Sequence, residues 1–143
     1  MPYKYLDHIA IADAAFQATG ATLEEMFTSA ADAAMNVMVA DLNTIADQHQ
    51  KHIQLSDESL DMLLFQFLQE FIFYKDAENL LLRPQTLKIT HTPPTYTLNA
   101  QLSGQTINPK IHELVTDIKA VTLHRLKVQK TKSTWTATVV LDT

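Results

Sequence analysis

Residues 56–75 read SDESLDMLLFQFLQEFIFYK, and this stretch decides how the chain folds. Its apolar side chains recur at intervals of three and four residues, which predicts a helix with a wide buried face over about residues 57–75. Ser56 is a suitable N-cap, and Asp57 and Glu58 complement the positive end of the helix dipole. The apolar stripe consists of Leu60, Leu63, Leu64, Phe67, Leu68, Phe71 and Ile72. We expect this helix to be the best-buried element.

A second helix is predicted on the N-terminal side, over about residues 22–40. Thr22 and Glu25 form a capping box, because the threonine oxygen can accept from the backbone N–H of Glu25 and the glutamate can reach back. Before this helix, residues 3–18 have apolar side chains at both parities, which favours one extended strand covered on both faces. Residues 51–55 predict a short strand between the two helices.

Strand patterns dominate after residue 80. Residues 86–91 and 96–102 flank a Pro93-Pro94 connection, which cannot donate ladder hydrogen bonds. Residues 114–128 predict a further strand whose change of apolar parity indicates a bulge near residues 124–125. The final run, residues 134–141, alternates cleanly and places Trp135 on its apolar side. Two helices and about six strands predict an α+β sandwich in one domain, residues 1–143, with helices covering one sheet face.

Composition excludes several classes of function. The 143 residues include 16 acidic and 11 basic side chains, and residues 1–80 hold 13 acids and 3 bases, a net charge of −10. This balance argues against a protein that grips a DNA or RNA backbone. The absence of cysteine excludes disulfides, thiolate zinc sites, iron–sulfur clusters and cysteine nucleophiles. With Gly20 and Gly104 as its only glycines, the chain cannot build a phosphate loop or a dinucleotide fingerprint.

No targeting or membrane segment is visible, so we expect a cytoplasmic protein. Two histidines, His49 and His52, could share a metal if they lay on a helix, although a polar surface loop is the simpler interpretation. The basic residues Lys127, Lys130 and Lys132 are most simply a solvated strand face, with weak RNA contact as the alternative.

Two aspartates stand out. Asp13 interrupts an apolar run, where an ionised carboxylate is costly unless it is paired, hydrogen-bonded or bound to a cation. Asp142 follows three apolar residues and is adjacent to Thr143, whose terminal carboxylate adds a further oxygen group. Carboxylates without thiolates suit a hard divalent cation such as calcium, magnesium or manganese. A capping or solvent-facing role for each aspartate is the alternative at this point.

Five segments in order along the chain match a set of family motifs: Tyr5–His8 with Ala12, Asp13 and Gly20; Thr22–Phe27 with Ala30 and Ala31; Leu63–Glu70, similar to L-L-x-x-x-L-N-E; Asp117–His124, similar to E-[IV]-K-A-[VI]-T-x-H; and Val139–Thr143, similar to V-x-F-D-[VI]. Through these segments the whole chain resembles the archease family. The family spacing H-T-A-D differs here, because His8 and Asp13 are five residues apart, and the family asparagine is Gln69.

The resemblance implies a strand–helix–strand–strand fold with an inserted helical segment. It also implies a non-catalytic cofactor protein that promotes guanylylation and multiple turnover of an RtcB-type RNA ligase, in tRNA splicing or RNA repair. The family's metal-binding carboxylates map onto Asp13 and Asp142, with Thr143 as a further ligand. Asp7 is the alternative to Asp13, and Lys119 matches the family's lysine before A-V-T, so Asp7 and Lys119 are candidates to face the partner.

Two other classes of function compete with this interpretation. A small stand-alone metal-dependent phosphate hydrolase would need a base or nucleophile beside the metal, and the sequence shows no such motif. A general chaperone or adaptor would need a large exposed apolar patch, whereas the helices have the pattern of core elements.

Overall fold

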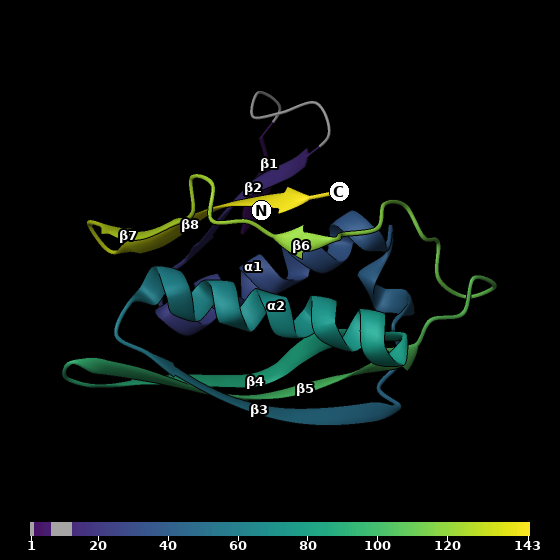
Figure 1. Ribbon diagram of the computed structural model, residues 1–143, viewed down its shortest axis with the longest axis horizontal. Coiled ribbons are helices and arrows are strands. Elements are labelled where there is room, and N and C mark those ends of the chain that lie inside the picture. The colour runs from purple at the N-terminus through teal and green to yellow at the C-terminus, as the bar shows by residue number, and fades with distance from the viewer. Residues whose placement is uncertain (1, 7–12) are drawn as a thin grey trace.

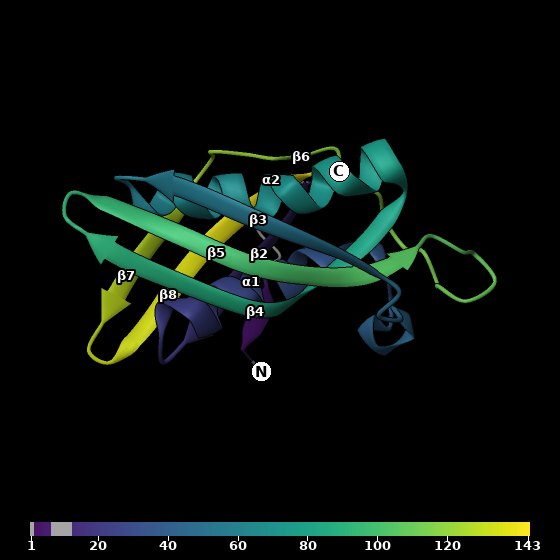
Figure 2. The same cartoon turned by 90° about the horizontal axis from the view of Figure 1, so that it is seen from below.

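The computed structural model describes residues 2–6 and 13–143, and within them two long helices lie between two antiparallel sheets (Figure 1). One sheet has the strand order β1-β2-β8-β6, with β7 also paired to β8, and the other has the order β3-β5-β4. Figure 2, a view from below, shows the three-stranded sheet crossing in front of the helices. The α+β class is confirmed, but the helices are covered by a sheet on each side instead of covering one face of a single sheet.

The helices begin where side-chain caps satisfy their free N–H groups. Helix α1 (Leu23–Met38) has the predicted capping box: Glu25 N–H donates to Thr22 Oγ1 at 3.1 Å, and Ala21 N–H donates to Glu25 Oε2 at 2.9 Å. Helix α2 (Leu60–Glu78) is capped by Ser59, so the prediction of Ser56 was wrong. Ser56 belongs to strand β3 (His49–Asp57) and lies opposite Thr97. Because the strand continues to Asp57, the helix begins about one turn later than predicted.

The N-terminal segment differs from the predicted single strand over residues 3–18. Strand β1 (Tyr3–Tyr5) runs antiparallel to β2 (Asp13–Gly20), with Tyr3 opposite Ala18. The chain therefore reverses between the two strands, and residues 7–12 lie outside the described part. The small apolar residues of both parities that suggested one long strand are also compatible with two strands facing the same layer of helices.

The three-stranded sheet is longer than predicted. Strands β4 (Leu80–Thr92) and β5 (Thr95–Thr106) form a hairpin around Pro93 and Pro94, and β3 pairs with the other edge of β5. The β4–β5 register shifts beside Pro84, which has no N–H to donate. Gly104 has no room for a side chain, because a Cβ atom there would lie 1.7 Å from the Leu81 carbonyl oxygen.

The C-terminal third holds less strand than predicted. Within residues 114–128 only β6 (Ala120–Val121) and the start of β7 (Lys127–Thr131) are strands, so the prediction of one strand with a bulge was wrong. The change of parity comes from a turn in which Arg125 has φ of 57°. Strand β8 (Thr134–Asp142) is central in its sheet and pairs with β2, β6 and β7. A short 3-10 helix, η1 (Leu42–Thr44), follows α1.

The core lies between the sheets and is built from both helices. Its largest fully buried side chains include Phe16 of β2, Met26 and Phe27 of α1, and Phe67 and Phe71 of α2. Trp135 is only partly buried at the edge of this core, with the Lys130 ammonium 5.5 Å from its ring centre. Within the described residues, no helix is long and apolar enough to cross a membrane.

Candidate functional site

Asp13 and Asp142 are brought together by the pairing of β2 with β8. They are direct partners in the antiparallel register, at the first residue of β2 and the last residue of β8. Side chains of directly opposed residues emerge on the same sheet face, with Cβ atoms about 4.5–5.5 Å apart. Asp13 is partly buried and Asp142 is exposed. The two aspartates, which are 129 positions apart in sequence, therefore form one acidic pair where strands β2 and β8 end.

This pair has the composition of a hard-cation site. Two like charges directly opposite each other on neighbouring strands destabilise the pairing. A divalent cation between them would turn that repulsion into attraction, and carboxylate oxygens are the ligands that calcium and magnesium prefer. Calcium takes six to eight oxygen ligands, so water or neighbouring groups would complete the shell. Thr143, half-buried and directly after Asp142, is positioned as such a neighbour.

Lys119 lies beside this pair through its backbone. Its N–H donates to the carbonyl oxygen of Asp142 at 2.8 Å, and the next residue, Ala120, is the register partner of Asp142. The Lys119 side chain is exposed and lines a cavity of about 400 Å³ against α2, together with Asp76 and Phe73. The structure thus places Lys119 next to Asp142 in the sheet but directs its side chain toward the α2 side of the segment.

Helix α2 holds the Asp117–Val121 segment against β8 through two polar side chains. The Lys75 side chain is only 7% exposed. Its ammonium pairs with Asp117, lies 3.0 Å from Asp76 Oδ1 and donates to the Ile118 carbonyl oxygen at 2.7 Å. One and a half turns earlier, Gln69 Oε1 accepts from the Val121 N–H at 3.0 Å. Lys75 and Gln69 therefore fix both ends of the short stretch that bonds to Asp142.

Lys75 and Gln69 were missed as site-supporting residues by sequence reasoning. The placement of Lys75 near the helix C-terminus suggested only a complement to the helix dipole. One signal was present: Lys75 follows Phe71 by four residues and Ile72 by three, so it continues the apolar stripe of α2. A lysine at a stripe position indicates a buried ammonium that needs acceptors.

The other titratable candidates are not gathered into a site. His49 and His52 lie on β3, where a spacing of three residues points side chains to opposite faces, so the shared-metal alternative is wrong. Asp7 and His8 lie outside the described residues. His112 is buried, with Nδ1 accepting from Asn108 N–H at 3.0 Å and Nε2 2.9 Å from Gln105 Oε1. Across residues 2–6 and 13–143, no three His, Asp or Glu side chains cluster as metal ligands.

The sequence matches known proteins along nearly its whole length. The model of the archease protein family matches residues 3–143. A protein archease of Methanosarcina mazei is 33% identical over 141 residues, covering 98% of this chain and 94% of that protein. A protein archease of Methanosarcina barkeri is 36% identical over the same length, with the same coverage.

Solved structures share the fold. A solution structure of a Methanobacterium thermoautotrophicum protein superposes with a TM-score of 0.85 at 29% identity, covering 99% of each chain. A crystal structure of a Thermotoga maritima archease, described as a possible chaperone, superposes with a TM-score of 0.55 at 18% identity. It covers 96% of this chain and 100% of that one, and at this identity the likeness concerns the fold alone.

Proposed function

Because the chain belongs to the archease family, we propose that it is a non-catalytic protein that binds a divalent cation and activates an RtcB-type RNA ligase. The observation that supports this most directly is the register pairing of Asp13 with Asp142. A cation bound there ties the first strand after the N-terminal reversal to the last strand of the sheet. The same ion presents a charged rim to a partner protein, and the exposed Lys119 side chain adds a positive charge on the neighbouring α2 side.

Among the described residues, the acidic pair has few of the side chains that catalysis would require beside a metal. A hydrolase needs a base or nucleophile positioned beside its metal, and the described neighbours of the pair are strand residues and the backbone of Lys119. These features favour a role in docking and in activating a partner. We therefore assign the joining chemistry to the ligase and a supporting role, acting in the cytoplasm, to this chain.

The experiment that tests the activator role measures ligase turnover. An RtcB-type ligase, limiting relative to RNA with 3′-phosphate and 5′-hydroxyl ends, is assayed with GTP and divalent metal in the presence and absence of the protein. We expect several RNA joins per ligase only when the protein is present, and faster guanylylation of the ligase. Equal turnover in both arms would refute the proposed function, and joining by the protein alone would point instead to an enzyme.

The same assay separates activation from general chaperone action, which is described as a possible role of the Thermotoga maritima archease. A chaperone restores activity to denatured ligase and to unrelated clients such as a heat-treated dehydrogenase. An activator increases the turnover of ligase that is already folded. Stimulation of a folded, freshly purified ligase without any effect on the unrelated client supports activation, and the reverse pattern supports the chaperone.

Lys119→Ala is expected to melt like the wild type but to lower ligase stimulation. Surface substitutions of this kind change the free energy of unfolding by less than about 0.5 kcal/mol. Charge steering acts on association, so we expect stimulation at limiting protein to fall by roughly ten-fold at low salt, and by less at physiological salt. Lys119→Arg should restore part of the effect. Lys132→Ala, an exposed lysine in the β7–β8 turn, is the matched control. Wild-type stimulation by Lys119→Ala at both salt concentrations would exclude a partner-facing role.

A further inference from the structure

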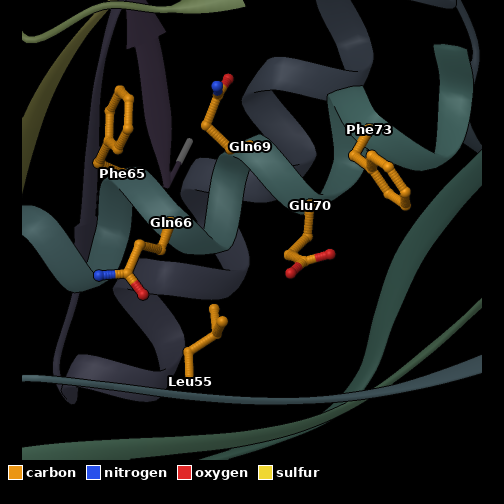
Figure 3. A pocket seen from close by; sticks show the side chains of 6 residues that line it. All are labelled: Leu55, Phe65, Gln66, Gln69, Glu70 and Phe73. Carbon is orange, nitrogen blue, oxygen red and sulfur yellow. The ribbon is translucent and has the colours of Figure 1, made fainter.

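A groove on the outer side of α2 is separate from the acidic pair, because none of its residues belongs to β2 or β8. It is a cavity of about 480 Å³ lined by Leu55, Phe65, Gln66, Gln69, Glu70 and Phe73, and we call it the α2 groove. Figure 3 shows Gln66 and Glu70 extending from α2 on the side of Leu55, with Phe73 at one end. The Phe73 side chain, 56% exposed, is the most exposed large apolar residue on this helix.

Glu70 is the unusual member of this groove. Within residues 2–6 and 13–143, its carboxylate has no hydrogen-bond or ion-pair partner. Burial raises its pKa, which means that the protein does not compensate the lost hydration of the charge. A glutamate that is partly desolvated among apolar side chains lowers stability when ionised, unless a cation meets it. A positive group from another molecule would supply the partner that this carboxylate lacks within the described residues.

Gln66 supplies a second acceptor one turn away. Its Nε2 donates to Asp57 Oδ2 at 2.9 Å, which fixes the amide and leaves Oε1 as a free acceptor. Residues four apart on a helix face the same side, so Oε1 of Gln66 and the carboxylate of Glu70 are neighbouring acceptors. A planar guanidinium has several N–H groups in a fixed fork, and it can bond to both.

The apolar walls also favour arginine over lysine. An arginine guanidinium is more weakly hydrated than an ammonium, so it enters a partly dry groove at a lower desolvation cost. Its flat face stacks on aromatic rings, and Phe73 presents such a ring at the end of the groove. Its aliphatic stem would pack on Leu55. The net charge of −10 in residues 1–80 adds long-range attraction for a basic partner.

From this charge and shape complementarity we propose that the α2 groove binds an arginine side chain of a partner protein, with the guanidinium on Glu70 and Gln66 and against Phe73. A second cavity of about 400 Å³ shares Gln69 and Phe73 with the groove and extends along α2 to Asp76 and Lys119. The partner segment therefore has room to continue along the helix with an apolar neighbour of the arginine.

The test is a titration followed by backbone NMR. The probe is the capped tripeptide acetyl-Leu-Arg-Leu-amide, and its counterparts carry lysine or the uncharged isostere citrulline in place of arginine. We expect saturable shifts of the amides from Gln66 to Phe73 with the arginine peptide, and binding weaker by roughly ten-fold with citrulline. Equal binding of citrulline or lysine, or shifts spread over the whole acidic surface, would overturn the proposal.

Glu70→Gln is the decisive variant, and Asp47→Asn is its control because it removes one exposed acidic charge outside the groove. The raised pKa of Glu70 means that its ionised form is less favourable in the folded than in the unfolded protein, so stability falls as pH rises through that pKa. Glu70→Gln should therefore fold at least as well as the wild type at neutral pH. We expect it to bind the arginine peptide roughly ten-fold more weakly, with Asp47→Asn unchanged. Unaltered binding by Glu70→Gln would reject the groove assignment.

Discussion

Lys75→Met is expected to lower the free energy of unfolding by about 2 kcal/mol, because a buried carbonyl oxygen loses its donor and the buried ammonium is removed from its two exposed carboxylate partners. Methionine preserves most of the packing of the lysine stem, but the Ile118 carbonyl oxygen would lose the Nζ donor at 2.7 Å. The side chains of Asp117 and Asp76 are 70% and 60% exposed, so water can solvate both carboxylates once the ammonium is gone. The expected loss of stability is therefore smaller than that from breaking a fully buried ion pair. Thermal and urea unfolding measure this change in the free energy of unfolding.

Lys51→Met is the matched control for this substitution. Lys51 also pairs with an acid near the end of α2, with Nζ 3.0 Å from Glu78 Oε1, but its side chain is 30% exposed. Exposed ion pairs contribute about 0–1 kcal/mol, so the control should unfold close to the wild type. Lys75→Met should also speed hydrogen exchange at the Lys119 and Val121 amides, because their segment loses an anchor. Equal stability of the two variants would contradict an anchoring role for Lys75.

The helices could be predicted because the residues that specify them lie close together in the sequence. The spacing of Leu63, Phe67 and Phe71 and the capping box at Thr22 each lie within a few turns of chain. The N-cap of α2 was misplaced because Ser56 and Ser59 are both followed by suitable residues. The choice between them depends on the pairing of Ser56 with Thr97, 41 residues away.

Strand β8 was predicted almost to its bounds from its clean alternation, but β6 and the division of the N-terminal segment into β1 and β2 could not be predicted from local sequence. Strand β6 has two residues, and its place depends on Lys75 and Gln69, whose contacts with Asp117 and Val121 span 42 and 52 positions in sequence. No local alternation of apolar and polar residues encodes such an element. The reversal between β1 and β2 was hidden because alanines at both parities are compatible with one long strand as well as with two.

The pairing of Asp13 with Asp142 was predicted in part from the residues and in part from the family resemblance. An aspartate within an apolar run indicates that its desolvated charge needs a partner, but it does not identify the partner group. The residues alone offered a shared cation site at Asp13 and Asp142 as one of two alternatives, and the resemblance favoured it. The β2–β8 register then placed the two aspartates side by side. Cation binding by this pair stays a prediction, as do the ligand role of Thr143 and the choice of Asp13 over Asp7.

The structure connects the acidic pair to the rest of the molecule by a short chain of contacts. Lys75 and Gln69 of α2 hold residues 118 and 121, and the intervening Lys119 N–H bonds to the carbonyl oxygen of Asp142. A partner that docks along α2 would therefore contact the same helix that holds the end of β8. Binding at the α2 groove and at the acidic pair is expected to be coupled through this helix.

Calcium is expected to stabilise the metal-free protein, and Asp142→Asn is expected to remove that stabilisation. An ion that binds only the folded state adds about 2.7 kcal/mol at a free concentration of 100 Kd, which corresponds to a rise in melting temperature of roughly 10 °C for a chain of this size. Without metal, Asp142→Asn should be at least as stable as the wild type, because it removes the repulsion between two carboxylates on neighbouring strands.

Opposite effects in the two conditions distinguish a cation site from an ordinary structural carboxylate. A carboxylate that served as a cap or a hydrogen-bond acceptor would lose stability on amidation with or without metal, whereas a member of a repelling pair gains stability without metal and loses only the response to calcium. Asp13→Asn should behave in the same way, and Asp47→Asn, which changes the net charge equally from an exposed loop, should respond like the wild type. Melting curves with EDTA and with excess calcium, magnesium or manganese measure all four proteins. If no ion shifts the wild-type melting temperature, or if Asp142→Asn keeps the full shift, the pair does not bind a cation, and its effect on a ligase would have to arise from its charge alone.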